Sequence, residues 1–72
     1  MRFTTPKDLS KKYNVTYPTI NYYIKVGLLD VIERKGNTRY LNKQSSEDMM
    51  KRVVWLKQKG FPLSMINKVM RG

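Results

Sequence analysis

The chain has 72 residues, and its 15 Lys and Arg against 5 Asp and Glu give a formal charge of +10. A chain this short buries one small core, so we predict a single domain over residues 1–72. It contains neither Cys nor His and its few carboxylates are scattered, so it lacks disulfides, the usual metal ligands and the usual general base, which argues against an enzyme.

The charge predicts a polyanionic partner, because an isoelectric point near 10.2 exceeds the value of about 9 that is typical of nucleic-acid-binding domains. A charged surface that only maintains solubility is the alternative, although about 2 to 8 net charges usually suffice for that. An anionic membrane would favour one dense basic helix, whereas these cations spread from Arg2 to Arg71. No apolar run approaches the roughly 20 residues that span a bilayer. We expect a cytoplasmic, nucleoid-associated protein that needs no cofactor and no metal.

The first predicted elements form a helix-turn-helix over about residues 5–27. Thr5 and Thr16 can each cap a helix by accepting a hydrogen bond from its first turn, and Asn14 between them suits the left-handed backbone that ends a helix. Apolar residues recur at spacings of three and four and place Tyr23 in the core. A plain helical hairpin would give the same pattern.

A β-hairpin is predicted next, over about residues 30–42. Residues 31–34 and 38–41 favour strands, and a Lys-Gly-Asn turn joins them. Such a hairpin would be a wing with three cations near its tip: Arg34, Lys35 and Arg39. A solvated hairpin whose charges only discourage edge-to-edge aggregation is the alternative.

Two further helices are predicted over about residues 46–59 and 62–70. Ser45 and Asp48 have the spacing of a capping box, and Gly60 suits a left-handed C-terminal cap. The expected core residues of these helices are Met49, Val53, Leu56, Leu63, Ile66 and Met70. Helical spacing places Trp55 beside cations instead, where it packs on the last helix or marks a protein contact. The fold class is therefore mainly α with a small β-hairpin, a winged helix-turn-helix.

Three stretches resemble the N-terminal DNA-binding domain of the MerR family. Residues 19–29 (TINYYIKVGLL) are similar to the family's Thr-Ile-Arg-Tyr-Tyr and Gly-Leu-Leu segment, and residues 36–40 (GNTRY) to its Gly-x-x-Arg-Tyr wing. Residues 45–48 and 56–63 (SSED, LKQKGFPL) resemble its capped third helix and Leu-x-x-x-Gly-Phe-Ser-Leu turn. Asn21 stands where the family usually has an Arg that holds a phosphate, and Pro62 replaces a capping Ser.

The resemblance implies a MerR-like winged helix whose second helix enters the major groove while the wing touches the DNA backbone. Asn21 could read adenine through its amide, and Tyr17 could contact a base or pack on the wing. Cations of the second helix and the wing would hold phosphates, Arg39 foremost because it belongs to the wing motif. The candidate DNA-binding residues are Thr16, Tyr17, Pro18, Thr19, Asn21, Tyr22, Lys25, Arg34, Lys35, Asn37, Arg39 and Tyr40.

Three functions remain open from the sequence. A transcription regulator's domain that binds specific double-stranded DNA leads, and the resemblance implies a homodimer formed through a segment beyond residue 72 or on adjacent sites. A plasmid-segregation or excisionase-like architectural protein would use the same fold to assemble on repeats. A protein-interaction module of a nucleoprotein complex would use Trp55 and the Met-bearing helix face.

Overall fold

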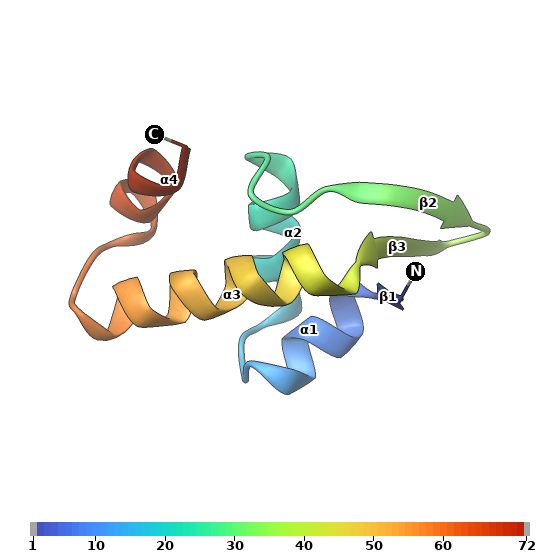
Figure 1. Cartoon of the computed structure of the whole chain (residues 1–72), viewed down its shortest axis with the longest axis horizontal. Helices are drawn as coiled ribbons and strands as arrows, with labels where there is room; N and C mark the ends of the chain where they lie inside the picture. Colours follow the sequence, from blue (N-terminus) through green and yellow to red (C-terminus); the bar gives the residue numbers. More distant parts are fainter. Residues whose placement is uncertain (1, 72) are drawn as a thin grey trace.

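The computed structural model describes residues 2–71, with side chains described up to Met70 (Figure 1). Its elements are β1 (Phe3–Thr4), α1 (Pro6–Lys12), α2 (Tyr17–Lys25), β2 (Val31–Lys35), β3 (Thr38–Asn42), α3 (Lys43–Gln58) and α4 (Leu63–Arg71). The predicted order of two helices, a hairpin and two more helices is confirmed. In Figure 1, α3 lies across the molecule, the hairpin projects past its N-terminal end and α4 follows at its other end.

Helices α1 and α2 begin and end at the residues that the sequence predicts. Thr5 Oγ1 accepts a 3.2 Å hydrogen bond from the amide of Asp8, and Thr16 caps α2 in the same way. Asn14 follows α1 with a φ of 53°, and Gly27 follows α2 with a φ of 87°. These left-handed residues turn the chain so that the last carbonyls of each helix find amide partners, which explains the abrupt helix ends.

The wing belongs to a three-stranded antiparallel sheet of order β1-β3-β2, whereas the sequence predicted only two strands. The additional strand β1 pairs Phe3 with Asn42 and Thr4 with Leu41. A strand of two residues is too short to show an alternating pattern, so its existence depends on the partner strand. β1 therefore ties the N-terminal end of the chain to the base of the wing.

Helix α3 begins earlier than predicted, at Lys43 instead of about residue 46. The N-cap is Asn42, whose Oδ1 accepts a 2.9 Å hydrogen bond from the amide of Ser45. The prediction that Ser45 caps this helix with Asp48 is therefore wrong. Asn is as strong a cap as Ser, and it lies where β3 ends, so the chain passes from strand to helix without a loop.

The core faces of the last two helices also differ from the prediction. Met50, not Met49, is fully buried in α3, while Met49 only packs against the edge of the core. Both residues have helical spacing to Val53, so the pattern could not choose between them. In α4, Leu63 is 38% exposed although it was expected inward, whereas Ile66 is fully buried and Met70 packs against the core, as predicted.

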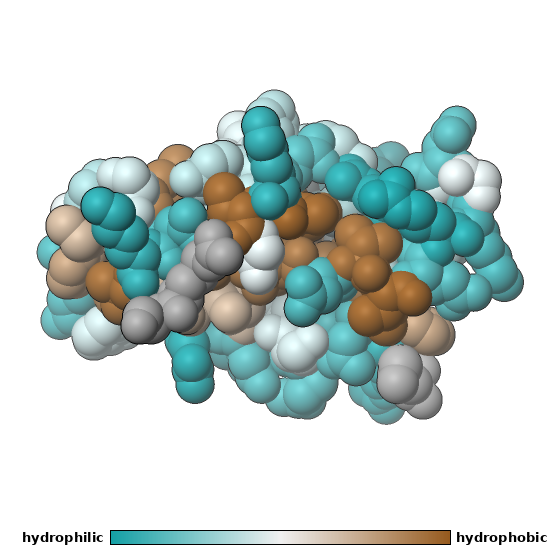
Figure 2. Space-filling model, turned by 90° about the horizontal axis from the view of Figure 1, so that it is seen from above, coloured by the Kyte–Doolittle hydropathy of each residue, from teal (hydrophilic) through white to brown (hydrophobic). Residues whose placement is uncertain are grey.

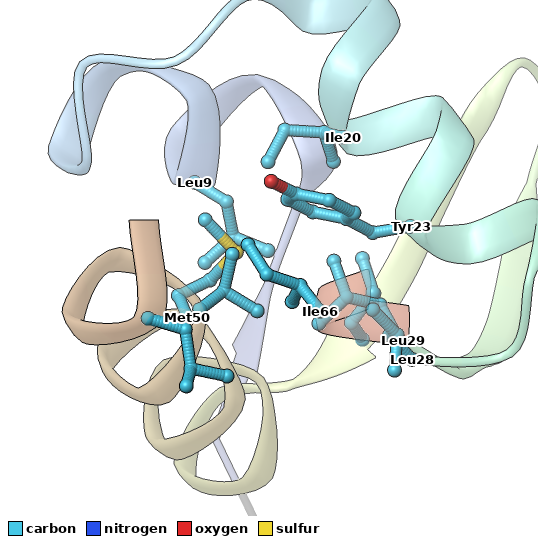
Figure 3. Packing of buried hydrophobic residues seen from close by; sticks show 10 residues of the cluster. Leu9, Ile20, Tyr23, Leu28, Leu29, Met50 and Ile66 are labelled. Carbon is cyan, nitrogen blue, oxygen red and sulfur yellow. The ribbon is translucent and has the colours of Figure 1, made fainter. Parts of the chain in front are cut away.

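A single cluster of buried apolar side chains joins all the helices to the sheet (Figure 3). Tyr23 of α2 belongs to this cluster, with an exposed fraction of 1%, as predicted. The members of the cluster are Leu9, Ile20, Tyr23, Leu28, Leu29, Leu41, Met50, Val53, Leu56 and Ile66. Because α2 contributes two residues and the base of the wing contributes Leu41, the core fixes α2 and the wing relative to each other.

Candidate nucleic-acid interface

The first turn of α2 presents hydroxyl groups beside its cap. Thr16 Oγ1 accepts the amide of Thr19 at 3.3 Å, and the two threonine hydroxyls lie 2.7 Å apart. Pro18 and Tyr17 are exposed next to them. Pro18 has no amide hydrogen and the Thr19 amide is used by the cap, so the two threonine hydroxyls are polar side-chain groups that this turn offers at the positive end of the helix dipole.

Arg39 of β3 connects the wing to α2. Its Nη2 donates to Asn21 Oδ1 at 2.6 Å and to the hydroxyl of Tyr17 at 2.9 Å. The guanidinium also lies 5.9 Å from the centre of the Tyr17 ring, within the range of a cation–π contact. The structure thus brings together three predicted site residues, and Tyr17 is bound to the wing, which was one of its two predicted positions.

The hairpin places a second cation on the same face as Arg39. Arg34 of β2 is the register partner of Arg39, and directly opposed side chains of an antiparallel pair share a face. Since Arg39 contacts α2, Arg34 belongs to the hairpin face turned toward α2. Lys35 pairs with Thr38 and therefore points to the other face near the turn.

Two like charges directly opposite each other destabilise a strand pair. Among the residues that the structure describes, the ion pair found joins Lys12 to Glu47 and involves neither arginine. The hairpin face that carries Arg34 and Arg39 is therefore positively charged.

The remaining candidate residues are distributed over α2 and the wing. Lys25 is exposed in the last turn of α2, and Asn37 is exposed in the turn of the wing. Tyr22 is half-buried against the core, and Tyr40 packs edge-on against Phe3, with ring centres 6.1 Å apart. Tyr22 and Tyr40 thus have at least one structural role each.

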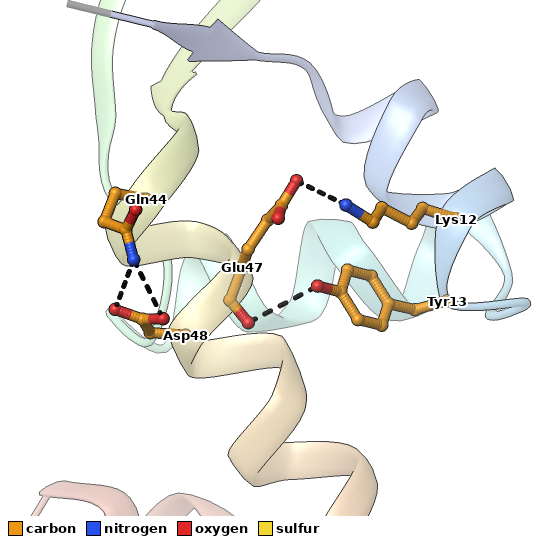
Figure 4. A network of polar contacts seen from close by, with 5 residues as sticks. All are labelled: Lys12, Tyr13, Gln44, Glu47 and Asp48. Atoms are coloured by element: carbon orange, nitrogen blue, oxygen red, sulfur yellow. Dashed lines mark hydrogen bonds and ion pairs between the residues drawn. The ribbon is translucent and has the colours of Figure 1, made fainter.

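An ion pair ties the opposite side of the domain together (Figure 4). Lys12 Nζ of α1 lies 2.8 Å from Glu47 Oε2 of α3, and the Tyr13 hydroxyl approaches the Glu47 carbonyl at 3.5 Å. The hydrogen bond from Lys12 lowers the pKa of Glu47, and the same bond raises the pKa of Lys12. Gln44 of the first turn of α3 donates to the Asp48 carboxylate at 3.2 Å.

An apolar groove between α3 and α4 was not located by sequence reasoning. Trp55 is 56% exposed beside it, with Lys59 Nζ at 5.3 Å from the ring centre. The groove has a volume of about 450 Å³ and is lined by Lys51, Arg52, Trp55, Leu56, Val69 and Met70. In the view from above, the tip of the hairpin at the far right is mostly hydrophilic, and the apolar residues at the surface lie nearer the middle of the molecule (Figure 2). The predicted position of Trp55 beside cations is confirmed.

The described part of the chain holds no cluster of three or more potential metal-ligating acids, and none of its helices has the length and hydropathy of a membrane span.

The sequence matches the family of MerR HTH regulatory proteins over residues 4–72. No curated protein gives a significant match. Among solved structures, the fold is similar to that of a MerR-family transcriptional regulator from Bacillus cereus, with a TM-score of 0.76 and 21% sequence identity. The similarity covers 99% of this chain and 53% of the other, so the chain spans about half the length of that regulator. Because the family match extends over nearly all of its residues, the chain belongs to the MerR HTH family of regulatory proteins.

Proposed function

We propose that this domain binds specific double-stranded DNA as the DNA-binding domain of a MerR-type transcription regulator in the cytoplasm. The observation that carries the proposal is the pair Arg34 and Arg39, which oppose each other on the hairpin face that contacts α2. Such a pair is favourable when a phosphate lies against it. Family membership supports the same assignment.

In this proposal α2 enters the major groove and the wing follows the backbone beside it. Asn21 and Tyr17 face the bases, while the hydroxyls of Thr16 and Thr19 and the exposed cations Arg34 and Lys25 face phosphates. Lys35 points to the other face of the hairpin and approaches the backbone from the tip of the wing. A homodimer, formed through residues beyond 72 or on adjacent sites, would read two half-sites. Spacing by whole helical turns would follow from that symmetry.

Selection from random duplexes, followed by footprinting at several salt concentrations, tests the function. A palindrome is expected for a dimeric regulator, whereas tandem direct repeats would favour segregation or excision. If about five phosphate contacts form, the logarithm of affinity should fall with the logarithm of salt concentration at a slope of roughly −4 to −5. Failure to enrich any sequence, together with a flat salt response, would refute DNA binding and leave the protein-interaction function.

A matched pair of variants locates the phosphate contacts. Arg34→Ala should reduce the magnitude of the salt slope by about one and weaken all sequences alike, because it removes one phosphate contact. Lys57→Ala removes an equal charge from the end of α3 that lies away from the hairpin and should leave the slope unchanged (Figure 1). Equal effects of the two variants would contradict the proposed position of the wing.

A further inference from the structure

The amide group of Asn21 has a fixed orientation. A guanidinium has only donors, so the atom that faces Arg39 at 2.6 Å must be the carbonyl oxygen Oδ1 and not the nitrogen Nδ2. The bond is charge-assisted, which makes it stronger than a bond between neutral groups. A second bond from Arg39 to Tyr17 prevents the guanidinium from turning away. Arg39 therefore holds the carbonyl side of Asn21 toward the wing.

This orientation leaves the amide nitrogen as the free hydrogen-bonding group of Asn21. Among the described residues, the polar contact of this side chain is the one that Oδ1 accepts. The Nδ2 group carries two hydrogens and accepts nothing. Asn21 consequently offers donors to a ligand, although an unrestrained amide offers a donor and an acceptor side by side.

Base edges respond differently to a group that only donates. In the major groove, adenine presents an acceptor beside a donor, whereas guanine presents two adjacent acceptors, N7 and O6. Adenine would have to direct its N6 hydrogen to the second lone pair of an oxygen that already accepts a short bond from a cation. The positive guanidinium repels the positive N6 hydrogen, so this second bond is weaker than a bond to a free amide oxygen. Guanine meets the free Nδ2 hydrogens without that conflict.

We propose that Asn21 is a specificity-determining residue that prefers guanine, and that Arg39 is the positioning residue that disfavours adenine, because its cation already donates to one of the two lone pairs of Asn21 Oδ1. The inference rests on the proposed DNA-binding function and changes the expected readout from adenine to guanine. It also changes the role of Arg39, which acts on specificity through Asn21 in addition to any phosphate that it holds.

The test compares the duplexes selected by the wild-type domain with those selected by Asn21→Leu and Arg39→Met. Asn21→Leu is a nearly isosteric change. The base pair that Asn21 reads is the position at which this variant loses the sequence preference of the wild type. At that position the wild type should bind guanine about fivefold or more tightly than adenine. Arg39→Met keeps the aliphatic stem but frees Oδ1, so the preference at the same position should change to adenine.

Arg34→Met is the matched control, because Arg34 opposes Arg39 on the same face of the hairpin. This variant should bind all DNA sequences more weakly and should retain the preference for guanine at the position that Asn21 reads. A wild-type preference for adenine, or an Arg39→Met variant that keeps guanine, would overturn the inference while DNA binding itself stands. If thermal melting shows that the Arg39→Met variant is unfolded, the comparison of wild type with Asn21→Leu still shows whether Asn21 prefers guanine or adenine. Absence of salt-dependent binding by the wild type would instead overturn the proposed function, and this inference with it.

Discussion

At the scale of single residues, Lys12 and Glu47 form the contact that responds most directly to pH. The pKa of Glu47 is lowered from its ordinary value of 4.5, chiefly by the hydrogen bond from Lys12. A carboxyl group whose pKa is lower in the folded state contributes stability above its unfolded pKa. That contribution is lost as the pH falls through the lowered folded pKa. The ion pair therefore helps to hold α1 on α3 at neutral pH and not in acid.

We expect Glu47→Gln to lower the free energy of unfolding at pH 7 and to have a decreasing effect as the pH falls below 4.5. Urea unfolding at a series of pH values measures the difference between wild type and variant. Lys12→Met, introduced into the Glu47→Gln background, should cost less than it does in the wild type, since its partner is already gone. A difference that is independent of pH would show that the loss comes from packing and not from the charge of Glu47.

At the scale of elements, α4 is attached to the domain by very little buried surface. Ile66 is fully buried, whereas Val69 on the same short helix is 49% exposed. Met70 is half-buried against the edge of the core, and the other apolar side chains of the helix are exposed or border the groove beside Trp55. Ile66 is therefore the fully buried contact of α4 among the residues that the structure describes.

Ile66→Ala should destabilise the domain by about 2 to 4 kcal/mol, because it removes buried methyl groups and leaves a cavity. For a domain of this size that is a large share of the total stability. Thermal or urea unfolding monitored by the single Trp55, which lies next to α4, reports the change. Val69→Ala is the control on the same helix and should cost less than about 1 kcal/mol. Equal losses would mean that α4 is held by its exposed face.

At the scale of the whole molecule, the charge of +10 is confined within extents of 36 × 24 × 21 Å. The Debye length is about 10 Å at 0.1 M salt and longer below it, so cations on different elements repel each other in dilute buffer. The same field attracts DNA. Stability and affinity consequently depend on salt in opposite directions.

Raising the salt concentration from about 0.05 to 0.5 M should raise the melting temperature of the free domain and weaken its binding to DNA. A gain of about 1 kcal/mol would correspond to roughly 4 to 8 °C in a domain of this length. Differential scanning calorimetry and binding titrations at matched salt concentrations give the two dependences. Lys57→Gln, which removes one unpaired charge, should reduce the rise in melting temperature. A melting temperature that falls with salt would contradict net repulsion.

Much of the fold follows from interactions that are local in the sequence. Thr5, Thr16, Asn14 and Gly60 were all predicted as helix boundaries because capping acts within a few residues of the chain. The hairpin and the order of the elements were predicted for the same reason. The N-cap at Asn42 could have been recognised from its spacing to Ser45, but the cap-like run that starts at Ser45 gave an equally good local signal.

The sequence by itself determined most of the residues that form helices, where most of those helices end, and that the domain is a basic winged helix-turn-helix. Tertiary structure alone decided that β1 joins the sheet, that Met50 faces the core, and that Arg39 binds Asn21 and Tyr17, which lie 18 and 22 residues away in the chain. Those contacts join segments that only the common core brings together. The residue pattern of a single helix or strand therefore does not predict which side chains of different elements come into contact.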